Sequence, residues 1–264
     1  MAMSAAQARP AARPIRRVAN RDIAFNVIAG AMRASLANPA RRRRLLKDLW
    51  IDLKRWGAPN VRSVEVSQIR GIERVSVEGP VLRQCPLVLT ALASLLECDS
   101  IFEFGTYRGD SAWLLAHNLP KAHVYTLDLP GPEALERAEL ELTDGAEYFQ
   151  KWDRGVRFRG TPEAERITQL FGDSATFDFA HYSGDIDLVF IDASHSYSYV
   201  RSDTEAAFGM LSELGTIVWD DYTYYPGVYA YLNEIGPSLD RPIFHIAGTR
   251  LAVYSRWDIV VPES

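Results

Sequence analysis

The chain has 264 residues, of which 47% are hydrophobic and 24% charged. This is the composition of an ordinary globular protein, and it excludes collagen-like and largely disordered chains. The length predicts one main domain with an appendage. No apolar run approaches the roughly 20 residues that a transmembrane helix needs, so we expect no membrane span. Two cysteines without metal-site spacing are too few for a disulfide scaffold, which predicts a cytoplasmic protein.

The net charge of −5 conceals a basic N-terminal segment. Residues 1–62 hold 14 Lys and Arg against 3 Asp and Glu, whereas residues 63–264 hold 15 against 31. We therefore expect residues 1–62 to be a basic, partly disordered extension and residues 63–264 to form the main domain. Apolar residues at helical spacing behind four consecutive arginines predict a helix near residues 41–56. Its basic face is either solvated, with the apolar stripe packed on the body or a second subunit, or a patch for nucleic acid or acidic lipid. A mitochondrial presequence has the same Arg-rich, acid-poor composition.

From residue 80 onward, helical and strand patterns alternate, which predicts a parallel sheet flanked by helices. In chain order we expect a helix over 87–96, a strand over 100–104, a helix over 111–118, a strand over 123–127, an exposed helix or insertion over 130–149, strands over 167–171 and 187–191, a helix over 197–211, a strand over 215–219, and a terminal hairpin formed by 242–246 and 250–254.

Acidic side chains follow several of these strands directly. Asp128, Asp192 and the pair Asp220–Asp221 each come immediately after an apolar strand. Ligands of an open parallel sheet bind outside the carboxyl ends of its strands. We therefore expect these carboxylates to converge on one edge of the sheet. For the pair 220–221, capping of the following helix is the alternative.

The first strand runs into a glycine loop, Glu103-Phe-Gly105-Thr-Tyr-Arg-Gly109. Its spacing differs from the G-x-G-x-x-G dinucleotide motif, and a carboxylate before the first glycine would repel phosphate but attract an amine. Asp128 at the next strand end can accept both hydrogens of a ribose diol. Gly172-Asp173-Ser174 at the third strand end suits an adenine amino group. Amine, ribose and adenine together describe S-adenosyl-methionine.

With these motifs, residues 82–256 resemble a class I S-adenosyl-methionine-dependent methyltransferase. The resemblance implies a Rossmann-like, doubly wound α/β fold with a seven-stranded sheet, mostly parallel, whose last strand is antiparallel. It also implies that the cofactor is bound by Glu103, Gly105, Thr106, Gly109, Ser111, Asp128, Asp173, Ser174 and Asp192. The long stretch between residues 128 and 167 departs from the family pattern.

A second motif narrows the family. Asp192-Ala-Ser-His195, followed by Trp219-Asp220-Asp221, is similar to metal-dependent small-molecule O-methyltransferases, especially those that act on macrolide sugars. The resemblance implies a Mg²⁺ site formed by Asp192, Asp220 and Asp221. Carboxylates forced together need a cation, and Mg²⁺ prefers oxygen ligands. His195 is then the candidate general base. Its alternative is a residue at a helix start, hydrogen-bonded to the backbone.

These features predict an O-methyltransferase that acts on a hydroxyl of a small molecule of the sugar or natural-product type. Tyrosines over residues 222–231 either form the acceptor wall or pack a helix. Two other functions stay open at this point, a NAD-dependent oxidoreductase and a nucleic-acid-binding or RNA-modifying protein that uses the basic segment. The acidic main domain makes nucleic acid the less favoured partner, and the apolar stripe behind the arginines favours a homo-oligomer.

Overall fold

The computed structural model describes residues 60–80, 84–140, 142 and 153–261. In this part of the chain one eight-stranded sheet has the order β1-β7-β8-β6-β5-β2-β3-β4. The strands are β1 (Arg62–Val64), β2 (Ser100–Phe104), β3 (His123–Asp128), β4 (Ile167–Phe171), β5 (Ile186–Ile191), β6 (Leu211–Trp219), β7 (Phe244–Ile246) and β8 (Ala252–Ser255). Neighbouring strands pair in parallel except β8, which is antiparallel to both β6 and β7.

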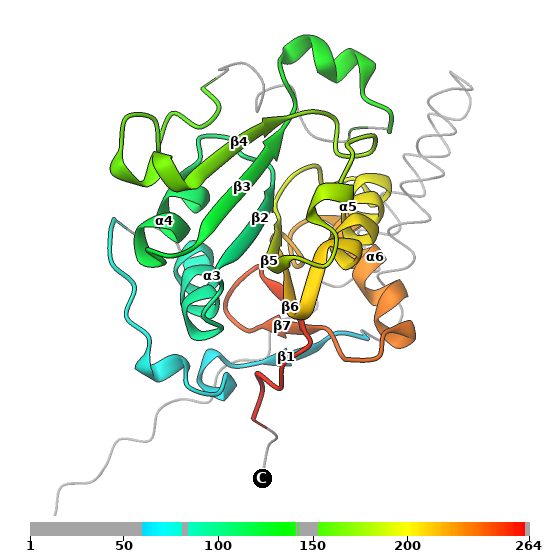
Figure 1. Cartoon of the computed structure of the whole chain (residues 1–264). Coiled ribbons are helices and arrows are strands. Elements are labelled where there is room, and N and C mark those ends of the chain that lie inside the picture. Colours follow the sequence, from blue (N-terminus) through cyan, green and yellow to red (C-terminus); the bar gives the residue numbers. More distant parts are fainter. Residues whose placement is uncertain (1–59, 81–83, 141, 143–152, 262–264) are drawn as a thin grey trace, which may run out of the picture. The chain divides into compact units, whose positions relative to one another are not determined.

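Helices cover both faces of the sheet, as in a doubly wound fold (Figure 1). The longer helices are α3 (Gln84–Leu95), α4 (Asp110–Asn118), α5 (Tyr197–Met210) and α6 (Pro226–Ile235). The short 3-10 helices are η1 (Val66–Gln68), η2 (Ile72–Arg74), η3 (Pro132–Arg137), η5 (Pro162–Arg166), η6 (Ala180–Tyr182) and η7 (Gly236–Ser238). Helices α3 and α4 share one apolar core with the sheet, and α5 and α6 share the other.

Strand β5 shows why the central strands are apolar almost throughout. Leu188 belongs to the core under α3 and α4, whereas the next residue, Val189, belongs to the core under α5 and α6. Because both faces of a central parallel strand are buried, its sequence reads as a continuous apolar run instead of an alternating one. The strand then ends at the polar edge of the sheet, where Asp192 follows.

The predicted Rossmann-like α/β fold with an antiparallel last strand is confirmed, but the predicted number of seven strands is wrong. Strand β1 adds an eighth, paired with β7 at one edge of the sheet. It begins at Arg62, the last residue of the predicted extension. The terminal hairpin is confirmed as β7 and β8.

Other expectations concern segments that are described in part or not at all. Of the predicted exposed helix over 130–149, the structure describes a 3-10 helix, η3, and residues 143–149 lie outside the described residues. The first 59 residues of the predicted basic extension, with the helix near 41–56, also lie outside them. No helix among the described residues is long and apolar enough to cross a membrane.

Candidate active site

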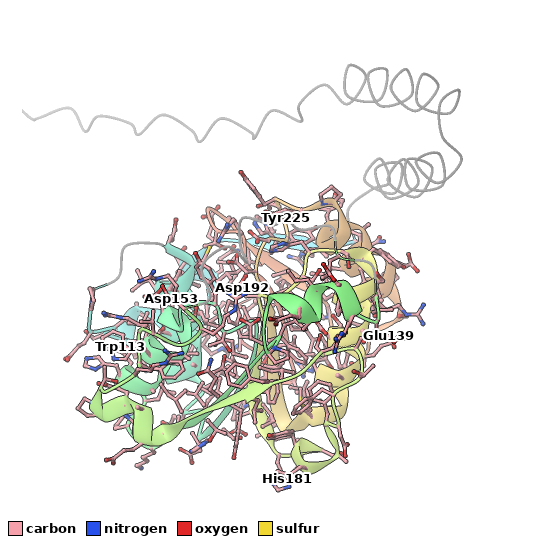
Figure 2. The ribbon with its side chains drawn as sticks, turned by 90° about the horizontal axis from the view of Figure 1, so that it is seen from above. Trp113, Glu139, Asp153, His181, Asp192 and Tyr225 are labelled. Carbon is pink, nitrogen blue, oxygen red and sulfur yellow. The ribbon has the colours of Figure 1, made fainter. Side chains whose placement is uncertain are left out.

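The carboxyl ends of the strands form one face of the molecule, and Figure 2 looks down on it, with Asp192 near its centre. Among the described residues, Gly105 lines three cavities on this face, of about 60, 230 and 400 Å³. Asp128 lines the 60 and 230 Å³ cavities, and Asp192 lines the 230 and 400 Å³ cavities. The expected convergence of strand-end acids is therefore present in the structure.

The glycine loop is a strand–turn–helix, as its spacing predicts. Gly105 follows β2 with φ of 94°, and a Cβ there would lie 2.1 Å from the carbonyl oxygen of Asp192. Gly109 precedes α4 with φ of 82°, and a Cβ there would lie 2.5 Å from the ring of Phe158. Both positions therefore require glycine, for backbone conformation and for space. The loop is pressed against the end of β5 on one side and against Phe158 on the other.

Glu103 lies beneath this loop and is only 1% exposed. The hydroxyl of Thr126 donates to its Oε2 at 2.5 Å, and the hydroxyls of Thr126 and Thr106 lie 2.8 Å apart. Burial raises the pKa of Glu103 to about 8, while the hydrogen bond from Thr126 opposes this shift. Ser111, at the start of α4, lines the 400 Å³ cavity and also hydrogen-bonds to Glu103.

Asp128 is held at the end of β3 by three groups. Its Oδ2 accepts the backbone N–H of Tyr107 at 2.8 Å and lies 2.9 Å from Nε of Arg154. Its Oδ1 accepts the backbone N–H of Leu129 at 2.8 Å. Burial raises the pKa of Asp128, and the charge of Arg154 opposes that rise. Asp128 thus lines both the 60 Å³ and the 230 Å³ cavity with its side chain held in place.

Asp173 and Ser174 line the 60 Å³ cavity. Asp173 accepts the hydroxyl of Tyr199 at 3.0 Å and the backbone N–H groups of Glu139 at 2.8 Å and Ala175 at 2.9 Å. Sequence reasoning missed Tyr199, because its partner lies 26 residues away and at the end of another element. This wall is polar and fixed by hydrogen bonds.

The buried carboxyl of Asp203, on α5 close to Asp173, makes folding stability depend on pH. Its side chain is buried, and burial raises its pKa from 3.8 to about 7. Folding therefore favours the protonated form. The free energy of unfolding is therefore highest below pH 3.8, where Asp203 is protonated in both the folded and the unfolded chain. It falls by about 4 kcal/mol in total as the pH rises through about 7.

Replacing Asp203 by Asn, which stays neutral, is expected to raise Tm relative to the natural protein, and to raise it more at pH 8.5 than at pH 5. Thermal unfolding followed by circular dichroism at both pH values measures this difference. A change in Tm of the same size at both pH values would contradict the assignment.

Three further residues gather at the ends of β5 and β6. Asp192, His195 and Asp221 each bring one oxygen or nitrogen atom within 4.8 Å of the others. Nε2 of His195 lies 2.8 Å from Oδ2 of Asp221. Burial raises the pKa of Asp192 well above its ordinary value, and the charges of Asp220 and Asp221 add to this. A cation placed here would relieve that repulsion.

The structure also places Arg250, just before β8, against the acidic pair. Its Nη2 lies 2.7 Å from Oδ2 of Asp220, and its Nη1 lies 2.8 Å from Oδ1 of Asp221. Asp220 also accepts the backbone N–H of Asp221 at 2.7 Å. The carboxylate of Asp220 is thus turned toward Arg250, whereas Asp221 spans from Arg250 to His195. Arg250 belongs to no motif, and only the pairing of β8 with β6 brings it here.

Residues 102–222, which span this site, match a family model described as a methyltransferase domain. These residues form a methyltransferase domain. The match agrees with the class I S-adenosyl-methionine-dependent methyltransferase that the sequence resembles. The matched region begins in β2 and ends just beyond the acidic pair, so it contains every predicted site residue.

Solved structures with a similar fold include three methyltransferases. An O-methyltransferase from Bacillus cereus, in complex with S-adenosyl-homocysteine, is 16% identical, with 74% of this chain and 89% of that chain covered and a TM-score of 0.48. TomG from Streptomyces achromogenes, an O-methyltransferase involved in tomaymycin synthesis, is 17% identical over 76% and 92%, with a TM-score of 0.46. A methyltransferase from Geobacter sulfurreducens is 16% identical over 73% and 86%, also with 0.46. Likeness at this level carries no information about substrate.

Helix α6, which follows the matched region, fixes the position of His195. The ring of Tyr225, which precedes α6, stacks on the imidazole with centroids 3.8 Å apart and an angle of 7°. In the first turn of α6, a Cβ on Gly227 would lie 2.3 Å from the carbonyl oxygen of His195. Of the predicted aromatic wall, Tyr222 and Tyr231 are buried in the core, whereas Tyr224 is 67% exposed.

Replacing Gly227 by Ala is expected to lower turnover by about 10²-fold, because the added methyl group must displace either α6 or the backbone at His195. Steady-state kinetics with a working acceptor measures the loss. The matched control is Ala at Gly209, an exposed position in α5 where a Cβ meets nothing within 4 Å. That change should leave turnover intact and stabilise the fold by about 0.5–1 kcal/mol. Full turnover in the Gly227 variant would contradict the close packing.

Proposed function

We propose that this methyltransferase transfers the methyl group of S-adenosyl-methionine to a hydroxyl of a small molecule of the sugar or natural-product type, with His195 as general base and with Mg²⁺ assistance. The observation that carries the proposal is the cluster of Asp192, His195 and Asp221 beside the glycine loop. All three residues line the 230 Å³ cavity together with Gly105. A base and a cation site would therefore lie next to a methyl donor bound along the glycine loop.

The three cavities around Gly105 suit the parts of the cofactor. The 60 Å³ cavity, with Asp173 and Ser174, would take adenine. Asp128, on the wall shared with the 230 Å³ cavity, would take the ribose. The methionine end would extend past Gly105 into the 400 Å³ cavity, toward Thr106 and Ser111. Glu103 would act from beneath the loop, through Ser111 and Thr126, which hydrogen-bond to it.

The residues at the ends of β5 and β6 fit a divalent cation. Carboxylate oxygens are the ligands that Mg²⁺ prefers. Burial raises the pKa of Asp192, the charges of Asp220 and Asp221 raise it further, and a cation would neutralise those charges. We propose Asp192, Asp220 and Asp221 as its ligands, with Asp220 joining them at the expense of its ion pair with Arg250. Bound there, Mg²⁺ would lower the pKa of an acceptor hydroxyl.

His195 has the surroundings of a general base. Asp221, 2.8 Å from its Nε2, would orient the ring and stabilise the imidazolium that forms when His195 takes the hydroxyl proton. Tyr225 fixes the plane of the ring by stacking. The remaining work of the site is positioning, since transfer from sulfonium to oxygen needs the two reactants in line.

Titration calorimetry with S-adenosyl-homocysteine, followed by a screen of acceptors with methyl-labelled S-adenosyl-methionine, tests the proposal. We expect binding of the cofactor product and labelling of a vicinal hydroxyl compound, either a sugar or a catechol. Labelling confined to amines, or binding of NAD in place of S-adenosyl-homocysteine, would overturn it. A homo-oligomer stays a prediction, as does a cytoplasmic location, with which the free thiols of Cys85 and Cys98 agree.

A further inference from the structure

Residues 153–160 lie against the outside of the glycine loop. The backbone N–H of Gly155 donates to the carbonyl oxygen of Tyr107, and that of Arg157 donates to the carbonyl oxygen of Arg108, both at 2.9 Å. Asp153, at the start of this segment, lies on the same face as Asp192 (Figure 2). This segment closes the stretch between β3 and β4 in which the sequence departs from its family. It therefore adds residues to the cofactor loop that the family motifs do not supply.

Arg154 is the residue that this segment brings into the site. Its side chain is only 5% exposed, and its Nε lies 2.9 Å from Oδ2 of Asp128. Its guanidinium carbon lies 5.5 Å from the centre of the Tyr107 ring, and it lines the same 230 Å³ cavity as His195. A buried guanidinium is costly unless it is paired. Its position is thus tied to Asp128 and to the loop at Tyr107.

The pairing has a consequence for what Asp128 can bind. An ionised carboxylate only accepts hydrogen bonds, so it can accept the hydrogens of both ribose hydroxyls, whereas a protonated carboxyl has an O–H of its own to place. Burial raises the pKa of Asp128, and Arg154 is the largest influence in the opposite direction. Without Arg154, the carboxyl would lose both an oriented partner and the cation that favours its charged form.

We propose that Arg154 is a positioning residue for the cofactor ribose, holding the carboxylate of Asp128 in the orientation that reads the 2′ and 3′ hydroxyls together. The proposal rests on the assignment of Asp128 to the ribose in the proposed function. It adds a residue that belongs to none of the motifs recognised in the sequence, and the 153–160 segment contributes it through the hydrogen bond from Gly155 to the backbone of Tyr107.

Calorimetry with two ligands, S-adenosyl-homocysteine and its 2′,3′-dideoxy analogue, tests this role. In Arg154→Gln, the affinity for S-adenosyl-homocysteine should fall about 10- to 100-fold, the range for a hydrogen bond to a charged group. Affinity for the dideoxy analogue should change by less than about twofold, because it has no diol for Asp128 to read. The matched control is Arg201→Gln on α5, an exposed arginine that pairs with Glu205 at 2.8 Å and lines none of the three cavities. It should bind both ligands as the natural protein does.

Two other binding results would overturn the proposal. An equal loss for both ligands would mean that Arg154 only supports the fold of the loop, and no loss would mean that Asp128 needs no partner. If Arg154→Gln fails to fold, Arg154→Lys keeps the charge but loses the planar fork, and its loss should again be confined to the ligand with a diol. If the natural protein itself does not bind S-adenosyl-homocysteine, the proposed function fails first, and this inference fails with it.

Discussion

Replacing Asp192 by Ala is expected to lower methyl transfer by at least about 10²-fold, the loss typical when an electrostatic contact to the reacting group is removed. Asp192 follows β5 and belongs to the cluster of potential metal ligands with His195 and Asp221. Without its carboxylate, the proposed divalent cation would lose a charged oxygen ligand beside the glycine loop. Turnover with a working acceptor, together with Mn²⁺ titration followed by electron paramagnetic resonance, measures both losses.

A matched control separates this effect from a general loss of acidic charge. Asp185 is exposed and lies just before β5, whereas Asp192 lies just after it, so Asp185→Ala should change neither turnover nor Mn²⁺ affinity. Asp220→Ala should resemble Asp192→Ala in turnover, and S-adenosyl-homocysteine binding should remain measurable in both. If both variants keep full activity, or if a saturating chelator leaves turnover intact, the metal assignment is wrong.

The sequence predicts the acidic half of this site because strand ends follow a simple geometric rule. Asp128 ends strand β3, and Asp192 and Asp220 directly follow strands β5 and β6. These strands are parallel, so their carboxyl ends must share one edge of the sheet. The apolar runs that precede these acids are long enough to be recognised as strands. Their convergence therefore follows from chain order and from strand direction alone.

The basic half of the site follows from no such rule. Arg250 reaches Asp220 and Asp221 only because β8 turns back antiparallel to β6, and Arg154 reaches Asp128 through backbone hydrogen bonds of a segment without strand or helix pattern. Strand β1 could not be predicted for the same reason. Its three residues are too few to show an alternating pattern, and Ser63 pairs with His245 of β7, 182 positions away. Contacts that depend on tertiary pairing leave no local trace in the sequence.

Replacing His195 by Gln is expected to lower kcat by about 10²- to 10⁴-fold, the usual contribution of general base catalysis. Gln keeps a polar side chain near Asp221 but cannot take a proton from the acceptor hydroxyl. Affinity for S-adenosyl-homocysteine should be unchanged, because the proposed cofactor contacts lie on the glycine loop, the start of α4, the end of β3 and the segment after β4. The matched control is His181→Gln, an exposed histidine far from Asp192 in Figure 2, which should leave kcat intact.

Mn²⁺ affinity decides between the two roles that the geometry permits for His195. As a base oriented by Asp221, it should lose turnover on substitution while Mn²⁺ affinity changes little. Its ring nitrogen nevertheless lies within the same 4.8 Å cluster as the carboxylates of Asp192 and Asp221. A His195→Gln variant that loses Mn²⁺ affinity and turnover together would therefore make His195 a metal ligand, and the proton would need another acceptor.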